Sequence, residues 1–136
     1  MYVYIVYGVA CDELSTVKSD LEKVLNVEFE LHESSYWGEY YIRRLPDFGE
    51  IRVGYNYVDE DWRERNFREY PVLIELNELE NLQEVMKAIK EKLPYAKLIR
   101  KKELVPKGKS RIKRKEYLFI NDKPLLISEQ ELKKLF

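Results

Sequence analysis

The sequence predicts one α+β domain: a two-layer α/β sandwich with a mainly antiparallel sheet, helices on one face, and a C-terminal hairpin and short helix. The chain has 136 residues, near the commonest size of a single domain, and 45% of them are hydrophobic, which is enough for a core. Segments with apolar residues at every second position, typical of strands, alternate with two segments whose apolar residues recur at helical spacing. Two helices cannot cover both faces of such a sheet, so we expect both on one face.

The first two predicted elements are a strand and a helix. Residues 2–9 are apolar at nearly every position, which indicates a strand buried on both faces near the centre of the sheet. The next segment has apolar residues at helical spacing and polar residues between them, with Asp12 as the expected N-cap. The apolar positions of this helix are Leu14, Val17, Leu21, Val24 and Leu25.

Three strands are predicted to follow as an antiparallel meander. In residues 27–31, Val, Phe and Leu alternate with glutamate, so Leu31 is expected on the buried face and His32 on the wet face. Residues 39–44 and 51–57 come next, and the last of these segments again alternates apolar with polar positions. The strands follow one another closely, which favours antiparallel neighbours.

The middle of the chain holds a charged segment, then a strand, a helix and a strand. Residues 59–69 show no buried pattern and are interpreted as a charged loop or one helical turn. Residues 70–76 return to a strand. The clearest helical stripe of the chain occupies residues 79–93 and ends before Pro94, and residues 95–99 form the strand that follows.

A basic segment divides the chain. Residues 101–115 contain eight basic residues and no hydrophobic period, which indicates a loop or a long hairpin tip. We therefore separate an α/β sandwich core, residues 1–100, from residues 101–136, a basic segment, β-hairpin and terminal helix appended to the same domain. Residues 1–96 hold 11 Lys and Arg against 20 Asp and Glu, whereas residues 97–136 hold 13 against 5. Such a split points to charged partners, although interleaving of the two halves in space would cancel part of it.

The C-terminal region predicts a hairpin and a helix. Two apolar runs, residues 117–120 and 124–127, flank a polar turn as in a β-hairpin. Ser128 and Glu131 have the spacing of a capping box, and Ile127 and Leu132 have the spacing of a hydrophobic staple. Two independent signals therefore favour a short terminal helix from Ser128.

Composition indicates a cytoplasmic protein. No apolar run approaches the roughly 18 residues of a membrane span. The N-terminal residues 1–7 lack the basic segment and cleavage site of a signal peptide. Cys11 is the single cysteine, so an internal disulfide is excluded.

Few residues are candidates for chemistry. His32, the single histidine, lies beside Glu30, but neighbouring residues of one strand face opposite ways and cannot build a Ser-His-acid site. Cys11 precedes a helix start that would favour its thiolate, yet such cysteines are usually small buried residues. Gly108-Lys109-Ser110 resembles the end of a phosphate-binding loop, but Glu103 stands where that motif requires glycine. We therefore predict that the protein is not an enzyme and has no catalytic residues, cofactor or metal site.

An acidic cluster with aromatic neighbours is the predicted partner-binding surface. The spacing of a calcium loop is absent from it, and a plain solvated face is the other interpretation. Trp62 and Phe67 are expected to be exposed amid charge, as typical interface anchors are, which favours a protein partner. The predicted contact residues are Tyr36, Trp37, Asp59, Glu60, Asp61, Trp62, Glu64 and Glu69.

The basic segment supports an alternative, a nucleic-acid-binding accessory protein. A basic hairpin tip could contact phosphates. No aromatic residue interleaves with the basic ones before Tyr117, so stacking on bases is not indicated. The residues of this alternative site are Lys107, Lys109, Arg111, Lys113, Arg114 and Lys115.

One stretch resembles a known group of proteins. It reads Phe29-Glu-Leu-His-Glu-Ser-Ser-Tyr-Trp-Gly-Glu-Tyr-Tyr41 and is followed by residues 51–56 and by Tyr70-Pro-Val-Leu-Ile74. Over roughly residues 1–80 the chain resembles small bacterial proteins that look like immunity proteins of polymorphic toxin and contact-dependent inhibition systems. The group would have two glycines before the acidic residue, where this chain has Trp37-Gly38-Glu39.

The resemblance implies a stoichiometric inhibitor that binds and blocks a toxin, often a nuclease. The partner would then be a basic toxin domain, and the acidic first 96 residues suit it, because charge complementarity speeds association. We therefore expect a non-catalytic protein-binding module of the immunity type.

Overall fold

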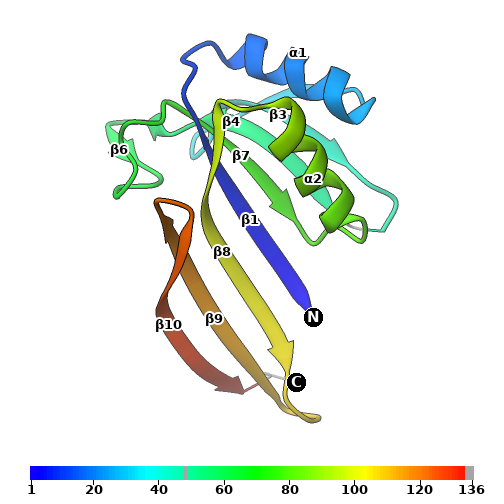
Figure 1. Ribbon diagram of the computed structural model, residues 1–136, viewed down its shortest axis with the longest axis vertical. Coiled ribbons are helices and arrows are strands. Elements are labelled where there is room, and N and C mark those ends of the chain that lie inside the picture. The colour runs from blue at the N-terminus through cyan, green and yellow to red at the C-terminus, as the bar shows by residue number, and fades with distance from the viewer. Residues whose placement is uncertain (48, 134–136) are drawn as a thin grey trace.

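The chain folds as an α+β protein around one large sheet, as the sequence predicts (Figure 1). The computed structural model describes residues 1–47 and 49–133. Every neighbouring pair of strands in the sheet is antiparallel. The eight strands are, in spatial order, β10 (Lys123–Lys133), β9 (Arg111–Ile120), β8 (Ala96–Pro106), β1 (Tyr2–Val9), β7 (Val72–Asn77), β4 (Glu50–Tyr55), β3 (Gly38–Arg44) and β2 (Glu30–Ser34).

Two sequence-local meanders flank the centre of the sheet. Strands β2, β3 and β4 form the first, as the sequence predicts, and β8, β9 and β10 form the second. Strand β1 lies between β7 and β8, which confirms the prediction of a central strand. A separate hairpin consists of β5 (Tyr57–Val58) and β6 (Asp61–Trp62).

The main core lies between one side of the sheet and the two helices, α1 (Leu14–Leu25) and α2 (Leu82–Lys92). Both helices lie over the same part of the sheet, and none lies over β9 and β10 (Figure 1). Apolar residues at helical spacing face inward from both helices. The buried helix residues are Leu14, Val17, Leu21, Leu82, Val85 and Ile89, and they pack on β1, β4 and β7. Within the part of the chain that the structure describes, neither helix is long and apolar enough to cross a membrane.

The segment of residues 56–70, which we call the crossing segment, covers part of the opposite side of the sheet. It contains the β5–β6 hairpin and ends in Tyr70. Phe67, expected to be exposed, is instead buried in a second, smaller core cluster with residues of the sheet, and Tyr70 packs against it. The sheet residues of that cluster are Val6, Leu73, Ile99 and Leu118.

Asn56 anchors the crossing segment at its start. Its side chain is fully buried. The Nδ2 group donates to the carbonyl oxygens of Phe67 at 3.0 Å and Tyr70 at 2.8 Å, and Oδ1 accepts from the backbone N–H of Glu64 at 2.8 Å. One amide thus satisfies three backbone groups of a segment that is not part of the large sheet.

Gly8 fixes the other end of the crossing segment. Tyr70 lies against Gly8 of β1 so closely that a Cβ at this position would overlap the Tyr70 ring. Glycine is therefore needed here because two parts of the chain approach closely.

Replacing Gly8 with alanine is expected to lower the free energy of unfolding by about 1–3 kcal/mol, because the new methyl group displaces Tyr70. Urea denaturation would measure it. Gly54→Ala is the matched control, since the nearest atom to its new Cβ is the Tyr40 Cβ at 3.4 Å. If Gly8→Ala unfolds at the wild-type urea concentration, the tight packing of Tyr70 is refuted.

The predicted terminal helix is wrong over the residues that the structure describes. Ser128 begins no helix, because β10 continues to Lys133 and pairs with β9 along its whole length. The backbone pairing of β10 with β9 and the ion pair of Glu129 with Lys113 outweigh the local capping signals. Residues 134–136, which that helix would also include, lie outside the described residues.

The basic segment is mostly strand. Of the two interpretations of residues 101–115, a loop or a long hairpin tip, the structure shows a hairpin. Its tip is only residues 107–110, because β8 continues to Pro106 and β9 begins at Arg111. Residue 100 lies inside β8. The predicted second hairpin is also confirmed: Ile120 pairs with Lys123 across Asn121 and Asp122. Both turn residues have positive φ, as a type I′ turn requires.

Two smaller predictions fail for reasons that the fold explains. Leu31 lies on the helix side of the sheet, but it is 57% exposed because β2 is an edge strand. Leu31 and His32 thus point to opposite sides of the sheet, as predicted, but Leu31 is not buried. The N-cap of α1 is Glu13 instead of Asp12, and its side chain makes no capping hydrogen bond.

Candidate protein-binding surface

The β5–β6 hairpin presents the densest group of acidic residues at a sharp turn. Val58 pairs with Asp61 and Tyr57 with Trp62, so Asp59 and Glu60 form the two-residue turn between them. These two residues have φ values of 53° and 62°, the conformation of a type I′ turn. We call residues 57–62 the acidic hairpin.

The carboxylates of the acidic hairpin are open to solvent. Asp59, Glu60 and Asp61 are all exposed. Asp61 accepts from the backbone N–H of Trp62 at 2.9 Å and from Arg65 Nη2 at 3.0 Å. These hydrogen bonds orient the Asp61 carboxylate, and the β5–β6 pairing fixes the backbone that carries Asp59 and Glu60.

Aromatic side chains flank these carboxylates. The rings of Tyr57 and Trp62 pack together with their centroids 4.9 Å apart, and Tyr57 is 51% exposed. The guanidinium of Arg68 lies 5.8 Å from the Trp62 centroid. A paired Tyr and Trp of this kind supplies contact area at low cost in side-chain entropy.

Arg63 brings the predicted contact residues Tyr36 and Trp37 next to the acidic hairpin. Its guanidinium carbon lies 3.0 Å from the Trp37 centroid and 5.7 Å from the Tyr36 centroid. Arg52 stacks on Trp37 as well, at 4.8 Å. A Cβ on Gly38 would lie 3.3 Å from Val58, so the two loops touch directly. Tyr36 and Trp37, 20 or more residues before the acidic hairpin in the chain, therefore lie beside it in the structure.

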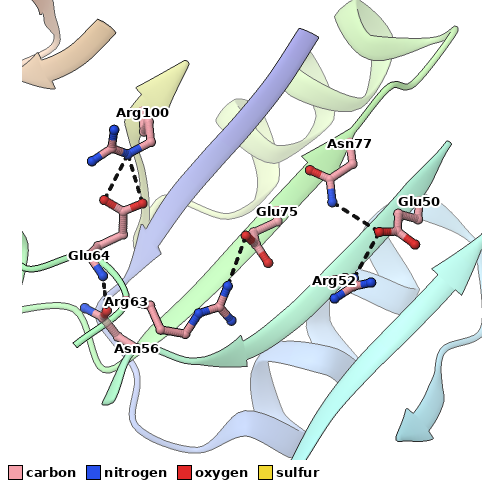
Figure 2. Close-up of polar contacts among 8 residues, drawn as sticks. All are labelled: Glu50, Arg52, Asn56, Arg63, Glu64, Glu75, Asn77 and Arg100. Atoms are coloured by element: carbon pink, nitrogen blue, oxygen red, sulfur yellow. Dashed lines mark hydrogen bonds and ion pairs between the residues drawn. The ribbon is translucent and has the colours of Figure 1, made fainter. Parts of the chain in front are cut away.

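Arg63 also reaches Glu75 of β7 (Figure 2). Its Nη2 lies 3.4 Å from Glu75 Oε1, and both side chains are largely buried. Burial raises the pKa of Glu75 above its ordinary value, against the opposing effect of the Arg63 and Arg52 charges. Burial likewise lowers the pKa of Arg63, although Glu75 opposes the change. The pair is a desolvated contact that fixes Arg63 under Trp37.

Glu64 and Glu69 lie away from the acidic hairpin. Glu64 is 7% exposed, and both of its carboxylate oxygens accept from Arg100 Nε at 3.0 Å (Figure 2). Its carboxylate thus joins the crossing segment to β8. Glu69 is exposed and lines a separate cavity of about 350 Å³ together with Tyr70. Of the remaining six predicted contact residues, Tyr36 and Trp37 lie against Arg63, and the other four belong to the adjacent acidic hairpin.

The basic residues of the alternative site are partly neutralised by β10. Lys113 pairs with Glu129 at 2.5 Å and Arg111 with Glu131 at 3.6 Å. Glu129 also raises the pKa of Lys113. Arg114 donates to Gln130 and lies 3.7 Å from Glu116, while Lys115 is half-buried. Lys107 and Lys109 lie exposed at the turn between β8 and β9.

The two residues considered for chemistry have simple surroundings. His32 Nε2 lies 3.3 Å from Glu30 Oε2, and its ring contacts Tyr40 with centroids 5.7 Å apart. Cys11 is half-buried, and its nearest polar contact is the carbonyl of Glu13. Across residues 1–47 and 49–133, no group of three or more His, Cys, Asp and Glu side chains could hold a metal ion.

Three residues that shape this surface were not predicted from the sequence: Arg52, Asn56 and Arg63. Asn56 sits at a polar position of an alternating segment, so the pattern indicates a wet face although the side chain is fully buried. Arg63 looks like one charge in a charged run. Neither gives a local signal of its partners, which lie up to 27 residues away in the chain. No protein-family model matches the chain, and no curated protein matches it.

Proposed function

We propose that the protein is a non-catalytic protein-binding module, built as a two-layer α/β sandwich, of the immunity type that binds and neutralises a toxin in the bacterial cytoplasm. The acidic hairpin is the observation that carries this proposal. It combines three exposed carboxylates with a packed Tyr57–Trp62 pair and with Tyr36 and Trp37 alongside.

The rigidity of the acidic hairpin favours binding. Its turn residues have defined backbone angles, and Trp37 is held between Arg52 and Arg63. Because the backbone of the turn and the Trp37 ring are ordered beforehand, association loses less conformational entropy at these positions. The exposed ring of Tyr36 and the half-exposed ring of Trp62 are suited to fill pockets on a partner.

The charge of the acidic hairpin selects the partner. Nuclease toxins carry basic clefts for their substrates, and an acidic inhibitor is attracted to such a cleft from a distance. Charge complementarity acts mainly on the association rate and on specificity. The favoured partner is therefore a protein domain with a basic face, with a nuclease toxin as the leading class.

Reversing the hairpin charges with Asp59→Lys, Glu60→Lys and Asp61→Lys is expected to slow association with the partner at least tenfold at low salt. The immobilised protein would first capture its partner from a nuclease-treated lysate of the encoding organism, and surface plasmon resonance would then measure the association rate. At about 0.5 M salt the difference should shrink, because screening is stronger.

The matched control reverses three exposed carboxylates elsewhere, with Glu28→Lys, Glu80→Lys and Glu91→Lys. This variant has the same net charge, and we expect its association rate to stay within about threefold of wild type. Equal slowing by both variants would mean that net charge alone matters. An unchanged rate for the hairpin variant would refute the acidic hairpin as the binding surface.

The nucleic-acid alternative makes a separate prediction. Since Arg111 and Lys113 are paired within the chain, we expect no shift of duplex or single-stranded DNA at about 150 mM salt. An electrophoretic mobility assay with about 10 µM protein would measure this. A shift at that salt that is lost in Lys107→Ala/Lys109→Ala would instead establish the turn between β8 and β9 as a phosphate-binding site.

A further inference from the structure

The helix layer of the fold leaves one end of the sheet uncovered. The main core cluster has contributions from β1, β4 and β7 but, among the described residues, none from β9 or β10. Figure 1 shows these two strands extending beyond both helices. On their helix side, Phe119 of β9 is half-buried and Leu126 of β10 is 46% exposed.

A groove runs where the helix layer ends, between α2 and strands β8 and β9. Its volume is about 690 Å³. The apolar residues that line it come from β1, α2, the α2–β8 connection, β8 and β9. They are Tyr7, Met86, Pro94, Ala96, Leu98 and Phe119.

Helix α2 has two different stripes, and the second one lines this groove. Leu82, Val85 and Ile89 form the stripe that is buried in the core. The other stripe has the spacing i, i+3, i+4 and i+7, so its side chains lie on one side of the helix. It consists of Gln83, Met86, Lys87 and Lys90, and all four line the groove.

The charge around the groove is positive. Lys87 and Lys90 are exposed along α2, and Lys97 of β8 also lines the groove. None of the three lysines forms an ion pair with another described residue. Asp122, in the turn between β9 and β10, is the one acidic residue among those that line it.

We propose that this groove binds an amphipathic α-helix of a partner protein, with acidic residues beside its apolar face. Such a helix would extend the helix layer over β8 and β9 next to α2, at the usual spacing of packed helices of about 8–10 Å. Its apolar side would cover Met86, Leu98 and Phe119. Its acidic residues would meet Lys87 and Lys90, which are three residues apart and therefore on adjacent turns of α2.

The shape of the groove favours a helix over a small molecule. Ligand pockets bury at least about 70% of a small ligand. Here the lysines that border the apolar floor are exposed along the groove, so a small ligand would remain largely in solvent. A helix, by contrast, needs only one face covered, and the half-buried Met86 has a flexible side chain that adapts well to such partners. This surface is separate from the acidic hairpin and prefers the opposite charge.

The test uses the full chain and two synthetic amphipathic peptides of about 18 residues, with leucine at i, i+3, i+4 and i+7. One peptide carries glutamate beside the leucines and the other carries lysine. Fluorescence anisotropy should show the acidic peptide binding at least tenfold more tightly than the basic one. Lys87→Glu/Lys90→Glu should weaken the acidic peptide at least tenfold, while Lys23→Glu/Lys92→Glu, with the same change in charge, should leave its Kd within about twofold.

Several results would overturn the proposal. The first is equal affinity for the two peptides, or no binding of either. The second is a wild-type chain that sediments as a dimer and becomes a monomer on Lys87→Glu/Lys90→Glu, since the groove would then hold a second copy. The third is one-to-one displacement of the peptide by laurate with a lower Kd, which would assign the groove to a small anionic amphiphile.

Discussion

Asn56→Ala is expected to lower the free energy of unfolding by about 3–5 kcal/mol. The side chain of Asn56 makes three hydrogen bonds to backbone groups of the crossing segment. Alanine would leave the Tyr70 carbonyl and the Glu64 N–H without this partner, whereas the Phe67 carbonyl would still accept from the Tyr70 N–H at 3.2 Å. A buried unsatisfied group costs about 1–3 kcal/mol. Urea denaturation followed by far-UV circular dichroism would measure the change.

Two further variants make the Asn56 experiment specific. Asn66→Ala removes an exposed amide from the same segment, and we expect a change within about 0.5 kcal/mol. Asn56→Asp keeps the shape but replaces the donor with a second acceptor, so it should destabilise at least as much as alanine at neutral pH. If Asn56→Ala unfolds at the wild-type urea concentration, the crossing segment is held by other contacts.

Arg63→Met is expected to lower the free energy of unfolding by about 2–4 kcal/mol at pH 7, and by much less at pH 5. Removing the guanidinium leaves the buried carboxylate of Glu75 without the cation 3.4 Å away. The pKa of Glu75, already raised by burial, must rise further once Arg63 is gone.

The direction of the pH dependence follows from that raised pKa. A carboxyl whose pKa is higher in the folded state than in the unfolded state holds its proton more tightly when folded. Stability then falls as pH rises from the ordinary Glu value of 4.5 through the raised one, because ionised Glu75 stays buried. Lowering the pH protonates Glu75 and removes the penalty. Urea denaturation at pH 5 and pH 7 would measure it.

The double variant Arg63→Met/Glu75→Gln should remove most of this pH dependence, since the buried group no longer ionises. Arg65→Met is the matched control, because Arg65 is 69% exposed and pairs with Asp61 at the surface. Its effect should stay below about 1 kcal/mol at both pH values. A pH-independent loss of stability in Arg63→Met would show that packing on Trp37, not the charge of Glu75, explains the contact.

Local periodicity predicts much of the fold. The central strand β1 is visible as a continuous apolar run and the helix α1 by its period of 3.6 residues. The first and last segments of the first meander are visible by their alternation of apolar and polar residues. The terminal helix fails for a physical reason. Ser128 and Glu131 have the spacing of a helix cap, but Glu129 and Glu131 form ion pairs with Lys113 and Arg111 of the neighbouring strand β9. A cross-strand partner outside the local window outweighs a capping box.

The candidate surface is less predictable than the fold. Composition alone identifies the acidic residues 59–61 and the neighbouring aromatic residues. The contact of Arg63 with Trp37, the burial of Glu64 on Arg100 and the bonds of Asn56 all depend on how the crossing segment folds over the sheet. A charged residue has no periodicity that distinguishes an exposed position from a paired one, so Glu64 could not be separated from Asp61.

The position of β1 has a consequence for synthesis on the ribosome. β1 is translated before both of its neighbours, and the earlier of them, β7, begins only at Val72. At bacterial elongation rates of about 5–20 residues per second, β1 stays unpaired for roughly 3–13 seconds. During that interval a mostly apolar strand is open to other nascent chains and to chaperones. Substitutions in residues 2–9 should therefore alter the yield of folded protein in cells even where they leave the purified protein equally stable.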